Sequence, residues 1–360
     1  MRRYLRPDLQ DISTYKAGSE TYRIKMDANE SPYDLPLKIR RILADELLKG
    51  NSLNLYPDSD ANRLRDKIAG CLGLNMENIL IGTGSDELIH IIIEAFVGKG
   101  DRVLCPTPSF GMYKIFTRIV GGIPVEYALD GSFDTSADAI LEAARKCSPK
   151  LIFICTPNNP TGNVLTNAEI IRILENFDGV VAVDEAYGEF ADETMANRVE
   201  EFGNLVVLKT FSKAMGLAGL RIGYSAASKS LSEEICMVKP PYNINSFSQR
   251  AAMLVLEETG LMRERIGQIV AAREWLYNEL KSLDGITVFP SRANFLLIKV
   301  PDGRLIYERL LKQGILVRHF IGHPVLGNCL RVTLGLDEDN KEFLRVLKEA
   351  ITDIKLSAEV

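Results

Sequence analysis

The sequence of 360 residues lacks the features that mark membrane, exported or nucleic-acid-binding proteins. No stretch approaches the ~20 consecutive apolar residues that a membrane-spanning helix needs, and no apolar segment follows the basic N-terminus. No block rich in lysine and arginine is present, and the formal net charge is −5, which argues against nucleic acid as the main partner. We therefore expect a cytoplasmic protein that binds neither membranes nor nucleic acids.

Cysteines at metal-binding or redox spacing are also missing. The six cysteines lie far apart, none forms a C-x-x-C pair, and three of them stand inside apolar runs. This pattern is typical of reduced thiols in the core of a cytoplasmic protein, and it argues against a disulfide framework or a zinc site. We accordingly expect no metal, and we find no internal repeat or low-complexity segment.

The composition is that of a globular protein, with 46% apolar and 25% charged residues. A chain of this length can form a large core and is expected to contain two domains. From Ile79 onward short apolar runs alternate with helical patterns, which predicts an α/β fold with a mostly parallel sheet and helices on both faces. The predicted strands are residues 79–81, 102–105, 125–127, 151–155, 180–183, 205–208 and 222–226.

The C-terminal third follows a different pattern. A long predicted helix over residues 262–283 precedes strands and helices in mixed order, which is typical of a smaller α+β domain. Residues 1–28 are polar and irregular, and we expect them to form an arm rather than part of a core. The predicted organisation is a large α/β domain over residues 30–260, with residues 1–29 and 261–360 forming the arm and the small domain.

Polar loops follow the predicted strands of the large domain. They are residues 82–87, 106–110, 156–162, 184–187 and 210–221. Each has an ordinary explanation by itself, such as a helix cap at Ser85 or Asp86 or a packing role for Phe110. Because ligands of such sheets bind outside the carboxyl ends of the strands, the shared location of these loops predicts one common site.

The last of these loops contains Lys213, which has small and apolar neighbours and no acidic residue within ten positions on either side. Desolvation lowers the pKa of such an amine and makes it nucleophilic, as in lysines that form Schiff bases. Arg221, Thr210 and Ser212 can bind a phosphate close to this lysine. A carbonyl-reactive lysine beside a phosphate site indicates pyridoxal phosphate, although a lone lysine is more often a solvated one.

Asp184 follows a strand that is apolar throughout. A carboxyl group buried there must either be protonated or have a cationic partner, and a pyridinium nitrogen is such a partner. Tyr187 and Asn159 can form hydrogen bonds to the ring oxygen of the same cofactor. The pair Asp184–Glu185 also has the form of a Walker B metal site, but no P-loop lysine motif stands upstream of it.

Several motifs carry a resemblance that extends from about Tyr15 to Gly335. The most specific are residues 157–163 (PNNPTGN), 183–187 (VDEAY), 210–213 (TFSK) and 219–221 (GLR), and shorter ones are 27–30 (DANE), 56–58 (YPD), 84–87 (GSDE), 292–295 (RANF) and 330–333 (LRVT). In these motifs the chain resembles the histidinol-phosphate aminotransferases, which are class II aminotransferases of fold type I that depend on pyridoxal 5′-phosphate. The resemblance implies that fold and that cofactor.

The resemblance also implies roles for individual residues. Lys213 would form the Schiff base and carry the proton, and Asp184, Asn159, Tyr187 and Phe110 would contact the cofactor ring. The residues implied to hold the cofactor phosphate are Ser85, Asp86, Thr210, Ser212, Arg221 and Tyr56 of the partner subunit, so a homodimer is expected. The residues implied to bind substrate are Tyr15, Asn159, Arg318 and Arg331, with Arg331 on the acidic group.

The implied reaction moves an amino group between glutamate or 2-oxoglutarate and imidazole acetol phosphate or L-histidinol phosphate, in histidine biosynthesis. Alternatives on the same scaffold are an aromatic amino acid aminotransferase and a threonine-phosphate decarboxylase. A cofactor-sensing regulator is disfavoured because the sequence has no DNA-binding extension. Two departures from the family pattern bear on the amino donor, namely phenylalanine instead of tyrosine at Phe110 and the segment 239–245.

Overall fold

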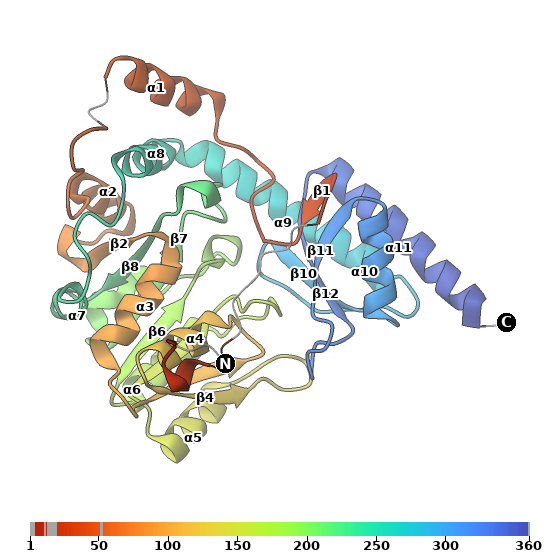
Figure 1. The fold of residues 1–360 in the computed structure, drawn as a ribbon, viewed down its shortest axis with the longest axis horizontal. Helices are drawn as coiled ribbons and strands as arrows, with labels where there is room; N and C mark the ends of the chain where they lie inside the picture. Colours follow the sequence, from red (N-terminus) through yellow and green to blue (C-terminus); the bar gives the residue numbers. More distant parts are fainter. Residues whose placement is uncertain (1–3, 11, 13–19, 51–52, 359–360) are drawn as a thin grey trace.

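The computed structural model describes residues 4–10, 12, 20–50 and 53–358 and contains two β-sheets (Figure 1). The larger sheet has the strand order β2-β8-β7-β6-β5-β3-β4. Its strands are β2 (Ile79–Gly82), β3 (Arg102–Thr107), β4 (Ile123–Ala128), β5 (Leu151–Cys155), β6 (Val180–Asp184), β7 (Leu205–Thr210) and β8 (Gly223–Ala227). Strand β8 is antiparallel to both of its neighbours, and the other pairs of this sheet are parallel. The prediction of a mostly parallel sheet is confirmed.

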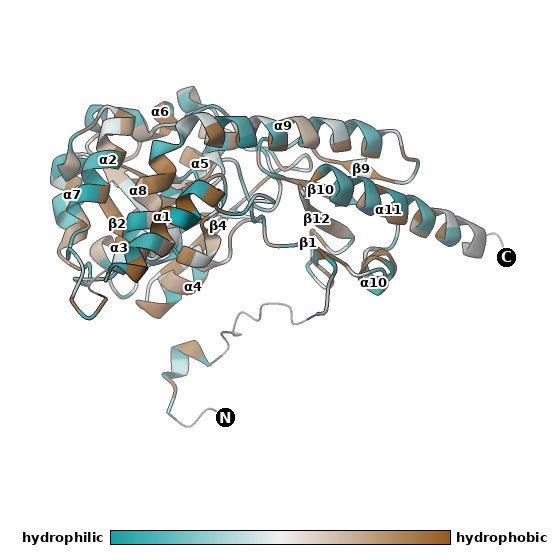
Figure 2. Ribbon diagram, turned by 90° about the horizontal axis from the view of Figure 1, so that it is seen from above, coloured by the Kyte–Doolittle hydropathy of each residue, from teal (hydrophilic) through white to brown (hydrophobic). Residues whose placement is uncertain are grey.

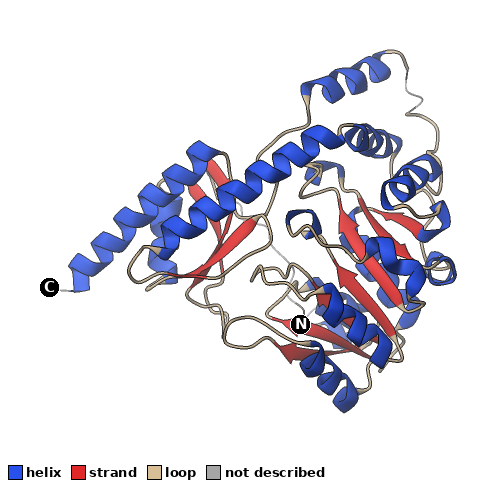
Figure 3. Ribbon diagram, turned by 180° about the vertical axis from the view of Figure 1, so that it is seen from behind, coloured by secondary structure: helices blue, strands red, loops and turns tan. Residues whose placement is uncertain are grey.

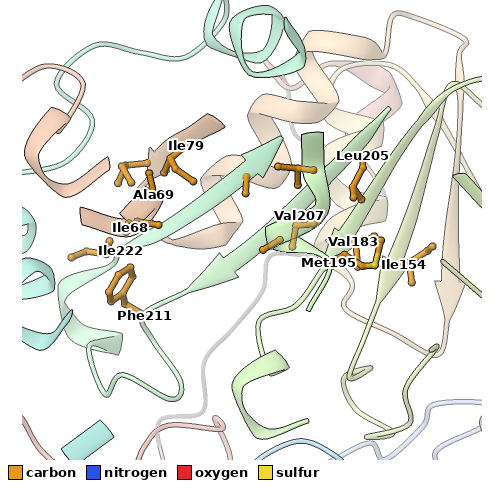
Figure 4. Close-up of a cluster of buried hydrophobic side chains, with 14 of the residues drawn as sticks. Ile68, Ala69, Ile79, Ile154, Val183, Met195, Leu205, Val207, Phe211 and Ile222 are labelled. Carbon is orange, nitrogen blue, oxygen red and sulfur yellow. The ribbon is translucent and has the colours of Figure 1, made fainter. Parts of the chain in front are cut away.

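The central strands are apolar on both faces, because helices cover the sheet from both sides. One face packs against α2 (Asn62–Leu72), α5 (Ala137–Cys147), α6 (Asn167–Asn176) and α8 (Ser246–Glu257), and the other against α3 (Gly84–Phe96), α4 (Met112–Ile119) and α7 (Lys229–Cys236). Figure 4 shows part of the first cluster, in which Ile154, Val183 and Val207 of neighbouring strands lie on the same face as Ile68 of α2.

The smaller sheet has the order β1-β11-β12-β10-β9. Its strands are β1 (Ile24–Met26), β9 (Thr287–Val288), β10 (Phe295–Lys299), β11 (Ile315–His319) and β12 (Cys329–Thr333), and its helices are α9 (Thr259–Lys281), α10 (Gly303–Lys312) and α11 (Asp337–Ala358). Helix α9 runs from the end of α8 to the small sheet, where it lies beside α11 (Figures 1 and 3). Both helices show hydrophilic and hydrophobic residues along their length in Figure 2, as expected of helices with one buried face.

Two details of the N-terminal region differ from the prediction. The polar arm contains β1, which pairs in parallel with β11 and buries Ile24 and Met26. A strand of three residues is too short for its alternation of buried and exposed side chains to stand out in the sequence. The spacing of Ile39, Leu43 and Leu47 after Pro36 predicts a helix with these three residues on one face. Helix α1 (Leu37–Leu48) buries Ile39 and Leu43, but Leu47 is 40% exposed.

The domain boundaries at residues 29/30 and 260/261 stay a prediction. The strands of the large sheet lie within residues 79–227, and those of the small sheet lie within residues 24–26 and 287–333. No helix in the described part of the chain has the length and apolar character needed to cross a membrane. Among the same residues, no three His, Cys, Asp or Glu side chains are grouped so as to hold a metal ion.

Candidate active site

A cavity of about 420 Å³ lies at the carboxyl ends of the large-sheet strands and is closed on its other side by residues of β11, β12 and the segment around β1. Twelve of the predicted site residues line it: Ser85, Asp86, Phe110, Asn159, Asp184, Tyr187, Thr210, Ser212, Lys213, Arg221, Arg318 and Arg331. The expectation that the loops after successive strands meet in one site is therefore confirmed as geometry. The cavity is polar and charged on a scaffold of buried strands.

Lys213 lies in the loop after β7, and its Nζ donates a hydrogen bond of 2.8 Å to the carbonyl oxygen of Ala28. The same Nζ lies 5.9 Å from the centroid of the Tyr187 ring. Burial lowers the pKa of Lys213 to about 8, with further lowering by the positive charge of Arg331. The direction of this shift is the one predicted from the sequence, and at a pKa of about 8 roughly a tenth of the amine is neutral at pH 7.

Asp184 ends β6 and is 4% exposed. Its Oδ2 accepts a hydrogen bond of 2.6 Å from the hydroxyl of Tyr113, and its Oδ1 accepts one of 3.0 Å from the N–H of Ala186. Burial raises the pKa of Asp184 to about 6, although both hydrogen bonds act in the opposite direction. The carboxyl group is thus costly to ionise unless a cation binds against it in the cavity.

Arg221 lies beside the first turn of α3. Its Nη2 donates to Oδ2 of Asp86 at 2.9 Å, and its Nη1 donates to Oγ of Ser212 at 3.4 Å. A Cβ added at Gly84, where φ is +75°, would lie 2.7 Å from Nη2 of Arg221, so glycine is what allows this close approach. The helix begins at Gly84 after Thr83, so Ser85 and Asp86 are not its caps. The free N–H groups of the first turn and the guanidinium together form an anion-binding cradle.

Two arginines from neighbouring strands of the small sheet also line the cavity. Arg331 of β12 is 8% exposed and donates hydrogen bonds to Oδ1 of Asn159 and to the carbonyl oxygen of Asp27. Arg318 of β11 is the register partner of Arg331 and also lines the cavity. Two guanidinium groups on paired positions of neighbouring strands create a positive region that suits a carboxylate or a phosphate.

Two aromatic side chains line the cavity as well. Tyr187 is 5% exposed, packs edge-to-face on Phe295 at 5.2 Å between ring centroids, and accepts a hydrogen bond of 2.9 Å from Nδ2 of Asn29. Burial raises the pKa of Tyr187 to about 12, so its hydroxyl is protonated at neutral pH. Phe110 lines the cavity and makes an edge contact of 5.6 Å with Tyr113.

Two predicted residues are not in this group. Tyr56 is 82% exposed and packs on Tyr242, with 4.8 Å between ring centroids, and it does not line the cavity of its own chain. Tyr15 lies outside the described residues.

Sequence reasoning missed three residues that matter to the site. They are Tyr113, which donates to Asp184, Asn29, which donates to Tyr187, and Lys25, which lines the cavity and pairs with Asp27 at 3.0 Å. Asn29 belongs to the short motif at residues 27–30, which was the only available signal for it. Tyr113 carries no local signal, because its partner Asp184 lies 71 positions away. Lys25 carries none, because it lies in β1, a strand too short to recognise in the sequence.

The family of the chain follows from comparison with known proteins. The family model described as "Aminotransferase class I and II" matches residues 22–347. A histidinol-phosphate aminotransferase of Ruminiclostridium cellulolyticum is 46% identical over 343 residues, covering 94% of this chain and 96% of the relative. The chain belongs to the histidinol-phosphate aminotransferase family.

Solved structures show the fold of this aminotransferase. A histidinol-phosphate aminotransferase from Sinorhizobium meliloti, in complex with pyridoxal-5′-phosphate, has a TM-score of 0.88 at 22% identity, and 98% of each chain is covered. Another from Clostridium acetobutylicum has a TM-score of 0.84 at 26% identity, covering 92% of this chain and 99% of that one. The predicted fold type is confirmed.

Pyridoxal 5′-phosphate is the cofactor of this aminotransferase family, and three features of the cavity fit it. Lys213 supplies an amine with a lowered pKa, as a Schiff base requires. Asp184 supplies a buried carboxyl group that has no cationic partner among the residues that the structure describes, and it suits a protonated ring nitrogen. Gly84 leaves room for Arg221 at the start of α3, where a phosphate would be bound.

Proposed function

We propose that this aminotransferase exchanges an amino group between glutamate or 2-oxoglutarate and L-histidinol phosphate or imidazole acetol phosphate, as a step of histidine biosynthesis. The observation behind the proposal is the pair Arg318 and Arg331, which are register partners on β11 and β12 and line the same cavity as Lys213. Both substrates carry an acidic group, a carboxylate or a phosphate, and both groups suit paired guanidinium donors. The 46% identity to a relative named for this reaction supports the same assignment.

We assign the cofactor contacts to residues that line one cavity. When bound, pyridoxal phosphate supplies a carbonyl carbon for the amine and a ring that withdraws electrons from the substrate Cα. Asp184 would face the ring nitrogen, Asn159 and Tyr187 would donate to the ring oxygen, and Phe110 would pack on the ring. The phosphate contacts are assigned to Ser85, Asp86, Thr210, Ser212 and Arg221. This assignment is supported by the burial of Asp184 and by the glycine-lined approach to Arg221.

Lys213 is assigned as the base that moves protons at the substrate Cα. With its pKa lowered to about 8, the Nζ can take a proton from Cα of the amino donor and return one to Cα of the product in the opposite half-reaction. Arg331 and Arg318 hold the acidic group meanwhile, and Tyr15 completes the phosphate site. The two half-reactions use the same residues, so the proposed kinetics are ping-pong.

We also propose that the active form is a homodimer in which Tyr56 of the partner subunit contacts the cofactor phosphate. Tyr56 packs on Tyr242, and both are exposed, as are the neighbouring residues Leu53 and Leu55, so a second copy could cover apolar surface here. The proposed domains are residues 30–260, and residues 1–29 with 261–360. The proposed location is the cytoplasm, which rests on thiols such as Cys105 and Cys155 that are buried in apolar surroundings.

A single-turnover experiment tests the proposed substrate. The loaded enzyme is mixed separately with histidinol phosphate, phenylalanine and threonine phosphate, and conversion of the cofactor to its amine form is followed by absorbance. Fast conversion with histidinol phosphate alone is expected. Faster conversion with phenylalanine, or release of carbon dioxide from threonine phosphate, would assign the enzyme to aromatic amino acid metabolism or to decarboxylation instead.

A further inference from the structure

Three short motifs of the sequence meet at one buried point beside the cavity. Asn29 comes from residues 27–30, Asn294 from 292–295 and Thr333 from 330–333. These three side chains are 1%, 0% and 4% exposed, respectively. None of them is assigned a role under the proposed function. Asn29 lies 304 positions from Thr333 and 265 positions from Asn294 along the chain, so the tertiary fold brings the three side chains together.

Every polar group of Asn29 takes part in this meeting. Its N–H donates to Oγ1 of Thr333 at 2.9 Å, and Oγ1 of Thr333 donates back to Oδ1 of Asn29 at 3.0 Å. The carbonyl oxygen of Asn29 accepts from Nδ2 of Asn294 at 3.0 Å. The remaining group, Nδ2 of Asn29, donates to the hydroxyl oxygen of Tyr187 at 2.9 Å. The residue has a left-handed φ of +53°, which asparagine tolerates better than most residues.

The backbone N–H of Asn29 fixes the direction of the other hydrogen bonds in this group. A backbone N–H can only donate, so Thr333 Oγ1 must accept from Asn29 and has its own proton left to give. That proton goes to Oδ1, which orients the Asn29 amide so that its NH₂ group faces Tyr187. The Tyr187 oxygen then accepts, and its single proton is directed elsewhere. The side chain of Tyr187 lines the cavity, so the cavity is where that proton can be donated.

We propose that Thr333 and Asn29 are positioning residues that fix the hydroxyl of Tyr187 as a hydrogen-bond donor into the cavity, toward an anionic oxygen of the bound ligand. The inference rests on the contact between Tyr187 and the cofactor ring oxygen given under the proposed function. It adds that Thr333 determines which partner donates the hydrogen bond in this contact. Thr333 belongs to β12, the strand that also carries Arg331. The strand that presents the substrate arginine thus also determines the donor offered to the cofactor.

A double-mutant cycle between Thr333→Val and Tyr187→Phe tests the inference in the loaded enzyme without substrate. The measured quantity is the pKa of the bound cofactor, read from its absorbance against pH. A donor to an anionic oxygen stabilises the less protonated form, so loss of the donor raises this pKa. Tyr187→Phe should raise it, and Thr333→Val should raise it by about half a pH unit to one pH unit, the size of one net hydrogen bond.

The matched control is Thr333→Ser, which keeps the hydroxyl and should leave the pKa of the cofactor unchanged. In the Tyr187→Phe background, Thr333→Val should produce no further shift, because the two residues act through one hydroxyl. An equal shift in that background would overturn the inference, because the effect would not pass through Tyr187. A shift with Tyr187→Phe and none with Thr333→Val would overturn the inference alone, whereas no shift with Tyr187→Phe would remove the proposed contact of Tyr187 as well.

Asn29→Asp gives a second test if Thr333→Val does not fold. The substitution keeps the shape of the side chain but replaces the donor by an oxygen that only accepts, so Tyr187 would donate to it and not into the cavity. Asn29→Asp should raise the pKa of the cofactor, and this rise should be smaller in the Tyr187→Phe background. A shift of equal size in both backgrounds would show a simple charge effect and would contradict the role of the Tyr187 hydroxyl.

Discussion

The hydrogen bond from Tyr113 to Asp184 should control the ionisation of the buried carboxyl group. Tyr113 is fully buried, and its ring stacks on Phe153 with 4.5 Å between centroids and an angle of 13°. Tyr113→Phe keeps this ring and removes the hydroxyl, so packing is preserved and the 2.6 Å hydrogen bond to Oδ2 is lost. We expect the main effect of the substitution to appear as a changed pKa of Asp184.

The size of the effect follows from the strength of the bond. A hydrogen bond to a charged group contributes about 1.5–3 kcal/mol, which corresponds to a rise of about one to two pH units in the pKa of the carboxyl group. Burial already raises the pKa of Asp184 to about 6 in the native protein. In Tyr113→Phe the pKa of Asp184 would therefore lie at about 7 to 8. Its distance from the value of about 3.9 for an unfolded aspartate would be larger than in the native protein.

The sign of the stability change is set by which state binds the proton. Between the unfolded and the folded pKa, the folded state of the cofactor-free protein holds a proton on Asp184 that the unfolded state has released. The free energy of unfolding therefore falls as pH rises through this interval and is constant above it. For the parent protein this fall ends near pH 6, whereas for Tyr113→Phe it should continue to about pH 8.

Urea denaturation of both cofactor-free proteins at several pH values between 5 and 8 measures this difference. Groups such as His319 and His323 titrate in both proteins, so their contributions cancel in the comparison. The extra loss of stability in Tyr113→Phe between pH 6 and 8 should be about 1.5–3 kcal/mol. Parallel curves for the two proteins over this range would refute the reasoning.

Three further predictions concern the lysine, the substrate arginine and the subunit contact. Borohydride reduction of the loaded enzyme should leave the cofactor attached to the peptide that contains Lys213, and Lys213→Ala should abolish the attachment; undiminished labelling of Lys213→Ala would contradict the assignment. Arg318→Ala should lower kcat/KM for histidinol phosphate by about 10- to 100-fold, the loss of about 1.5–3 kcal/mol from charge-assisted hydrogen bonds, with a smaller loss in Arg318→Lys; equal loss for phenylalanine would argue against a phosphate contact. If Tyr56 of the partner subunit completes each site, hybrid dimers of Tyr56→Phe and Lys213→Ala chains have one site with both defects and one site with neither. Activity should then recover when the two variants are mixed. No recovery would contradict the shared site.

Much of the large sheet was predictable because its central strands are buried on both faces. Strands β5 and β6 read as continuous apolar runs for this reason, and the bounds predicted for β5 are those observed. The cavity residues were predictable as a set, because the loops that hold them all follow strands whose carboxyl ends meet at one edge. The direction of the pKa shift of Lys213 followed from its apolar neighbours alone.

The remaining features depend on contacts that no local pattern contains. Tyr113 reaches Asp184 across 71 positions of the chain, and Asn29 reaches Tyr187 across 158. Strand β1 is stabilised by β11, which lies about 290 residues away, as the pairing of Ile24 with Ile315 requires. Such contacts are set by tertiary packing. For the same reason, the motif around Tyr187 could not predict that its hydroxyl oxygen accepts a hydrogen bond from Asn29.

Transfer of labelled nitrogen is the most direct test of the proposed reaction. The loaded enzyme is incubated with ¹⁵N-glutamate and imidazole acetol phosphate, and the products are identified by mass spectrometry. The label should appear in histidinol phosphate, with one equivalent of 2-oxoglutarate for each molecule formed. Label that remains in glutamate while the enzyme transfers amino groups readily from phenylalanine would contradict the proposed reaction.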